Sequence, residues 1–163
     1  MKNKKEFLEL KNVSDYWKKL LWEFDNLKNK PNNVYFAFNF IVTAWHLTDW
    51  YFREKHPNDD DQSLKLKIKN FVEENPVVEI SEHLANGAKH FEITFKKHKS
   101  VKSAVKERYV EEGYWEKGYS EDPIIVYINE DFKSEFGKSI KLDYYSKKLM
   151  EFWLNQLTDE QLI

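Results

Sequence analysis

Hydrophobic residues follow helical spacing over most of this chain. Residues 5–28 carry a near-heptad seam, which predicts a first helix. The seam consists of Phe7, Leu10, Ser14, Trp17, Leu21, Phe24 and Lys28. Residues 33–56 are apolar on nearly every side, with Asn33 as a cap and His56-Pro57 as a stop. A helix that is apolar all round belongs in the centre of a fold.

Two further segments before residue 95 also have helical spacing. Residues 62–74 follow an acidic loop, and residues 77–91 follow Asn75-Pro76, where proline is tolerated in a first helical turn. Four consecutive helices joined by short loops are typical of an up-and-down bundle.

The C-terminal part of the chain mixes strand and helix patterns. The β-branched run Ile124–Ile128 predicts a strand, and residues 137–142 are its expected hairpin partner. Asp143 can cap a last helix that ends near Leu157. The expected fold is therefore mainly α, an up-and-down helical bundle of four to five helices with a small β-hairpin near the C-terminus.

A length of 163 residues predicts a single domain with a sizeable core. Its expected parts are the helical bundle over 5–95, a basic and then acidic aromatic loop over 96–122, the β-hairpin over 123–142 and the C-terminal helix over 143–157.

Composition narrows the function classes. Twenty-six basic and 28 acidic residues leave a net charge of −2, so any attraction for nucleic acid is local. The absence of cysteine excludes disulfides and thiolate chemistry, and four glycines are too few for phosphate-binding loops. Polar residues interrupt the longest apolar region and no secretory signal is evident, so we expect a cytoplasmic protein with no membrane partner.

Polar side chains form a stripe on each of two predicted helices. The first stripe is Asn39, Thr43, His46 and Arg53, with Asp49 on its flank, and the second is Glu79, His83, Asn86 and His90. At about 100° per residue, each set shares one helical face. The stripes predict one site if they face each other. The alternatives are a buried hydrogen-bond network for the first stripe and an ordinary solvent face for the second.

Imidazole can give or take a proton near pH 7, so the stripes suit general acid–base chemistry on RNA. The candidate catalytic residues are His90, His83, His46 and Asn86, and the candidate phosphate contacts are Arg53, Lys89, Lys96, Lys97 and Lys99. Bases would stack on Tyr114, Trp115 and Tyr119, for which core packing is the alternative role.

Metal binding is a third possible chemistry. The available ligands are His83, His90, Glu79, His46 and Asp49, a nitrogen and carboxylate set that zinc, iron or manganese accept. The chain has no Glu-x-x-His pair and no two histidines three or four residues apart within one of these helices. No metal and no other cofactor is therefore expected.

The segment Ala85-Asn86-Gly87-Ala88-Lys89-His90 resembles the HEPN superfamily, small α-helical bundles that include bacterial RNase toxins and defence proteins. The resemblance implies that His90 matches the family histidine and Asn86 a polar neighbour, with His46 or Asp49 joining from the second helix. His83 stands where the family carries an arginine. The resemblance also implies a homodimer with one shared cleft. Residues 85–99 are similar to uncharacterised bacterial proteins as well.

The leading functional hypothesis is an HEPN-like protein of a bacterial defence or toxin–antitoxin type that binds or cleaves RNA, as a metal-independent endoribonuclease in the second case. The second is a non-catalytic interaction module, such as an antitoxin or defence-complex subunit, with a protein partner. The third is a metal-dependent bundle enzyme.

Overall fold

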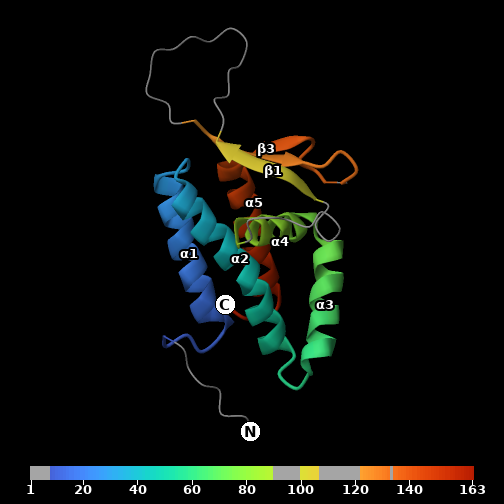
Figure 1. Ribbon diagram of the computed structural model, residues 1–163. Coiled ribbons are helices and arrows are strands. Elements are labelled where there is room, and N and C mark those ends of the chain that lie inside the picture. The colour runs from blue at the N-terminus through green and yellow to red at the C-terminus, as the bar shows by residue number, and fades with distance from the viewer. Residues whose placement is uncertain (1–7, 90–99, 107–121, 133) are drawn as a thin grey trace.

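The computed structural model describes residues 8–89, 100–106, 122–132 and 134–163 (Figure 1). Over these residues the chain forms five helices and a three-stranded antiparallel sheet, which confirms the prediction of a mainly α bundle with a small β element. The helices are α1 (Val13–Asn29), α2 (Val34–Lys55), α3 (Asp61–Glu74), α4 (Pro76–Lys89) and α5 (Leu142–Asp159), and the strands are β1 (Val101–Lys106), β2 (Ile124–Ile128) and β3 (Ser139–Lys141).

Helix α2 is the centre of the helical layer, as its apolar surface predicts. It contacts α1, α3 and α4. In Figure 1 α1, α2 and α3 alternate in direction, α4 lies across them, and α5 runs behind. The sheet covers one end of the bundle, above α4 and the start of α5.

The ends of α2 follow from local sequence. The side-chain oxygen of Asn33 accepts hydrogen bonds from the amides of Tyr35 at 2.9 Å and Phe36 at 3.2 Å, which satisfies two first-turn donors. The helix ends at Lys55, before His56-Pro57, because a residue before proline is pushed out of helical geometry.

Aromatic side chains join α2 to α3 and α5. The ring of Tyr51 lies 5.9 Å from the rings of Phe71 and Trp153, centroid to centroid. Tyr51 and Trp153 are buried, and the same core cluster continues to Val126 and Ile140 of the sheet. Helices and sheet therefore share one hydrophobic core.

The predicted start and seam of the first helix were wrong. Helix α1 begins at Val13 because Asn12 caps it, accepting from the Asp15 amide at 2.9 Å. Leu21 of the predicted seam is 40% exposed. The buried seam lies mainly one residue earlier, and its members are Val13, Trp17, Leu20, Glu23 and Leu27. Phe7 lies outside the described residues.

The predicted hairpin is confirmed, and it is part of a larger sheet. Strand β2 pairs with β3 as expected, and its other edge pairs with β1. The prediction of a loop was wrong for residues 101–106, because the buried strand β2 needs hydrogen-bond partners on both edges. Asp143 is in the first turn of α5 and does not cap it, since the helix starts at Leu142 directly after β3.

Within the described part of the chain, none of the helices has the length and apolar character needed to cross a membrane.

We predict that Asn33→Ala lowers the free energy of unfolding by about 1 kcal/mol, because two first-turn amides of α2 lose their acceptor. Urea denaturation followed by circular dichroism measures the change. Exposed Asn29 at the end of α1 is the matched control. An equal loss for Asn29→Ala would contradict the capping role.

Candidate functional site

Helices α2, α3 and α4 enclose an open cleft of about 960 Å³, called here the acidic cleft. Its lining comprises Trp45, His46, Thr48 and Asp49 from α2, Lys65, Ile68, Lys69, Val72 and Glu73 from α3, Glu79 and Glu82 from α4, and Ser100. His46, Asp49 and Glu79 were expected site residues on two different helices. The structure brings these three together at one cleft.

The charge of the cleft is negative. Its lining has four carboxylates and only two lysines. The carboxylates are Asp49, Glu73, Glu79 and Glu82. Asp49 is paired with Arg53 at 2.9 Å, and Glu73 is paired with Lys69 at 3.6 Å. The negative excess is therefore centred on Glu79 and Glu82, where it favours a cation over a phosphate group.

The ionised forms of Glu79 and Glu82, two carboxylates on α4, are disfavoured by their surroundings. Burial raises the pKa of Glu79, and nearby Glu73 raises it further. Burial also raises the pKa of Glu82, with Glu79 adding to the effect. Both shifts mean that the ionised forms are under-solvated and repel their neighbours. Perturbed carboxylates in a cleft mark a candidate functional site.

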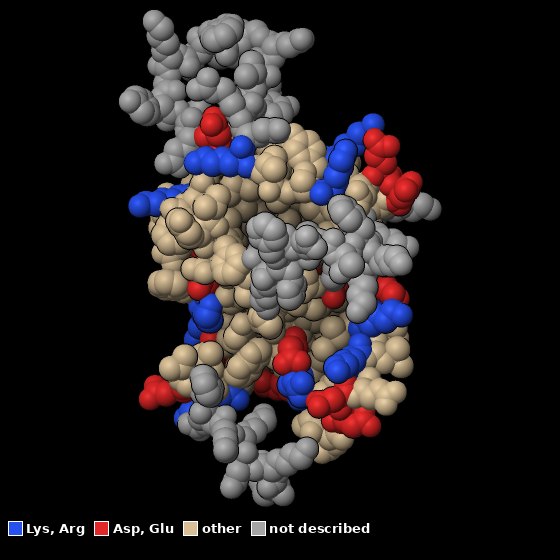
Figure 2. Space-filling view, in the orientation of Figure 1, with Lys and Arg blue, Asp and Glu red and all other residues tan. Residues whose placement is uncertain are grey.

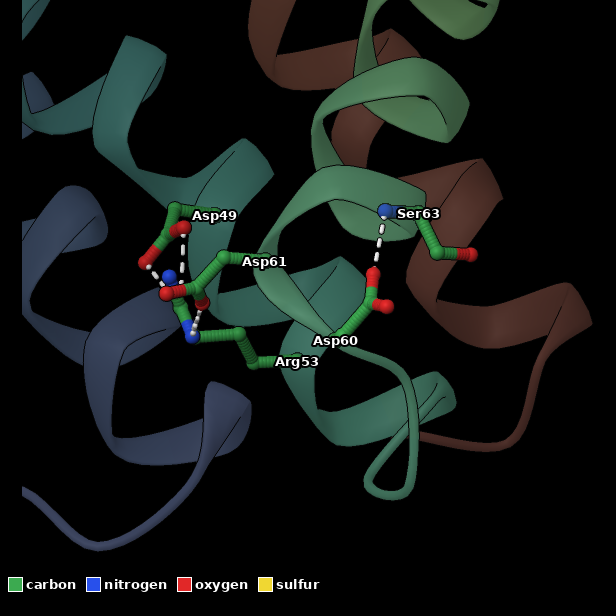
Figure 3. Close-up of polar contacts among 5 residues, drawn as sticks. All are labelled: Asp49, Arg53, Asp60, Asp61 and Ser63. Carbon is green, nitrogen blue, oxygen red and sulfur yellow. Dashed lines mark hydrogen bonds and ion pairs between the residues drawn. The ribbon is translucent and has the colours of Figure 1, made fainter.

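Arg53 was expected to hold phosphate, and it lies between two carboxylates (Figure 3). Its Nε donates to both oxygens of Asp49 at 2.9 Å, and its Nη1 donates to Asp61 Oδ1 at 3.3 Å. Asp49 is the main reason that the pKa of Arg53 is raised. The guanidinium therefore links α2 to the start of α3, where Asp60 accepts from the Ser63 amide at 2.7 Å.

The first predicted stripe divides between two faces of α2. Thr43 is buried and accepts a hydrogen bond of 2.7 Å from Lys19 Nζ of α1, which also donates to Glu23 at 2.8 Å. Asn39 is exposed, and His46 is half-buried at the cleft. Thr43 thus belongs to a polar network between α1 and α2, the alternative role that the sequence allowed.

The side chain of Tyr16 marks the edge of this α1–α2 network. Its ring stacks on Trp50 with centroids 5.0 Å apart. Burial, with Asp49 and Glu23 nearby, raises the pKa of Tyr16 to about 12. The hydroxyl therefore stays protonated across the physiological range and is unsuited to act as a base.

His83 lies away from the acidic cleft, between α4 and the sheet. It is only 2% exposed, and its Nδ1 accepts a hydrogen bond of 3.0 Å from the Val101 amide. The hydroxyl of Ser100 lies 3.3 Å from the same nitrogen. A nitrogen that accepts from a backbone amide carries no hydrogen, so the neutral ring is protonated at Nε2. The geometry suits a role in positioning β1 on α4. Because His83 is buried, it is not part of a solvent-exposed face, which was the alternative for the second stripe.

The remaining expected site residues are either near the end of α4 or outside the described ranges. Asn86 is half-buried on α4, and Lys89 ends that helix. The expected residues outside the described ranges are His90, Lys96, Lys97, Lys99, Tyr114, Trp115 and Tyr119. Among the described residues, no group of three or more His, Asp or Glu side chains is arranged to hold a metal ion.

The surface charge of the described residues is mixed. Figure 2 shows Lys and Arg interspersed with Asp and Glu over the visible face, without one continuous basic area in its described part. Lys102 and Lys106, which belong to the basic run, are exposed on β1. The described surface in this view therefore offers no broad phosphate-binding track.

Sequence patterns did not identify Glu82 or Thr48 as residues of the cleft. Glu82 lies three positions after Glu79, a spacing that places both on one side of a helix and could have revealed it. Thr48 is 1% exposed and lines the cleft, and its Oγ1 has no hydrogen-bond partner within the described structure. No sequence signal distinguishes such a threonine from one that bonds to its own helix.

No protein-family model, curated protein or solved structure matches this chain.

We predict that Glu82→Gln stabilises the protein at neutral pH. The pKa of Glu82 is raised by folding, so the folded state binds the proton more tightly than the unfolded chain. Its stabilising contribution is present below the ordinary value of 4.5 and is lost as the pH rises through the raised value. At pH 7 the variant should therefore melt about 1–2 °C higher than wild type.

Thermal melts at pH 7 and pH 4 measure this effect. The difference between Glu82→Gln and wild type should shrink at pH 4, where the carboxyl is largely protonated. Exposed Glu74, outside the cleft, is the matched control, and Glu74→Gln should change the melting temperature less. A lower melting temperature for Glu82→Gln at pH 7 would contradict the strained carboxylate.

Proposed function

We propose that this protein is a non-catalytic interaction module whose acidic cleft binds a basic segment of a partner polypeptide. The observation that carries the proposal is the pair of carboxylates on α4, Glu79 and Glu82, whose pKa values are both raised within one cleft. A cation between them would restore the favourable electrostatics that burial removes. Binding a lysine or arginine side chain would therefore relieve a cost already present in the free protein.

The rest of the lining suits the long side chains of lysine and arginine. Trp45, Ile68 and Val72 add an apolar wall on which an aliphatic stem can pack. The indole of Trp45 can also attract a cation over its ring face.

The size and shape of the cleft favour a peptide segment over a small ion. Its volume of about 960 Å³ lies near the top of the range of about 300–1,000 Å³ for ligand pockets. Three helices contribute to its walls, so several side chains of one extended segment can be accommodated.

RNA binding and HEPN-like cleavage stay predictions. They rest mainly on His90 and the lysine run, which lie outside the described residues, and on His83, which is engaged with β1. The negative excess of the cleft opposes phosphate binding there. The homodimer and the toxin–antitoxin or defence setting likewise stay predictions.

We predict that a fluorescein-labelled peptide of alternating lysine and alanine binds the full chain, and that the combined change Glu79→Gln with Glu82→Gln weakens binding about tenfold or more. Fluorescence anisotropy measures the affinity, and the affinity should fall as salt is added because the contact is ionic. Glu74→Gln is the matched control, since this exposed glutamate lies outside the cleft.

A glutamate–alanine peptide and a labelled single-stranded RNA serve as comparison ligands. The proposal requires that neither competes with the basic peptide. Loss of affinity in Glu74→Gln equal to that in the double variant would contradict the proposed site. Tight binding of the RNA, with none of the basic peptide, would support the nucleic-acid hypothesis instead.

A further inference from the structure

A second pocket lies on the side of α4 that faces the sheet. It has a volume of about 390 Å³ and is formed by the first half of α2, by α4, by the strands β1 and β2, and by the start of α5. Its apolar wall includes Val34, Phe38, Ile41, Leu84, Ile124 and Leu142. We call it the His83 pocket, because this buried histidine also lines it.

The charge at the His83 pocket comes from one lysine among the described residues. Lys102 is exposed on β1 and brings a positive charge to the pocket. His83 is buried beside the pocket and is engaged by the Val101 amide through Nδ1. No carboxylate is among the lining residues described. The pocket is thus complementary to an acceptor group with negative charge.

We propose that the His83 pocket binds a small amphipathic carboxylate, with its hydrocarbon body on the apolar wall and its head group at Lys102. A mostly apolar cavity with a few convergent polar groups is typical of small-molecule sites, and its volume falls in the lower part of the usual range of about 300–1,000 Å³. The hydrocarbon supplies the affinity through burial, and the lysine selects the charge of the head group.

This site is independent of the acidic cleft. Glu79 and Glu82 line the cleft, whereas Leu84 and Gly87 of the same helix line the His83 pocket. The two cavities share no lining residue and have opposite charge preferences. Failure of the basic peptide to bind would leave the His83 pocket untouched.

Three probes of equal chain length test the proposal. They are decanoate, decanol and decyltrimethylammonium, each used below its micelle-forming concentration with the full-length chain. The affinity from ¹H–¹⁵N NMR titration should be highest for decanoate, lower for decanol and lowest for the cation. The amides of residues 101–104 should shift with decanoate. Equal or tighter binding of the cation, or no binding of decanoate, would overturn the proposal.

Two pairs of matched variants locate the ligand. Lys102→Gln should weaken decanoate about three- to fivefold and leave decanol unchanged, whereas Lys106→Gln, exposed on the same strand and outside the lining, should change neither. Ala104→Phe places a ring on the pocket side of β1 and should abolish binding of both. Val105→Phe points to the opposite face and should leave binding intact, because side chains alternate along a strand.

The outcome for each pair decides the site. All four substituted residues are exposed on β1, so the variants should fold, and circular dichroism verifies this for each of them. Loss of decanoate binding in Val105→Phe but not in Ala104→Phe would overturn the assignment to this pocket. Equal weakening of decanoate by Lys102→Gln and Lys106→Gln would overturn the role of Lys102.

Discussion

The hydrogen bond from the Val101 amide to Nδ1 of His83 is the contact on which the placement of both cavities depends. It joins the middle of α4 to the first residue of β1 in a place almost fully removed from water, where an unpaired amide would cost about 1–3 kcal/mol. Ser100, at the same nitrogen, lines the acidic cleft. Once β1 is fixed there, one side of α4 faces the acidic cleft and the other faces the His83 pocket.

The same geometry explains why the two cavities have opposite character. On the cleft side, α4 presents carboxylates toward α2 and α3, and their partial burial disfavours the ionised form and raises their pKa values. On the sheet side it presents a histidine, a leucine and a glycine toward apolar strands. Tyr145 of α5 adds a second tie, donating to the Val77 carbonyl at 2.7 Å near the start of the helix. The position of α4 is therefore determined by contacts at both its start and its middle.

Local signals predicted much of the fold. Asn33 and His56-Pro57 gave the bounds of α2, and the β-branched run gave β2, because caps, prolines and β-branching act within a few residues. The sequence did not predict β1, whose pairing depends on a strand more than fifteen residues away. Glu79 and His83 of the second stripe line different cavities, because α4 contacts α2, α3, α5 and β1 and its side chains have partners in several directions. Helical spacing of polar residues identified His46, Asp49 and Glu79, which the structure brings together at one cleft. The same spacing was not used to identify Glu82.

The central claim is that His83 positions β1 through Nδ1 and does not exchange protons with a substrate. Long-range ¹H–¹⁵N NMR of the histidine side chains in the full-length protein at pH 7 tests this directly, since it reports which ring nitrogen carries the hydrogen. The bond to the Val101 amide requires His83 to be the neutral form protonated at Nε2. A hydrogen on Nδ1, or a ring protonated on both nitrogens, would contradict the account and return His83 to the list of candidate acid–base groups.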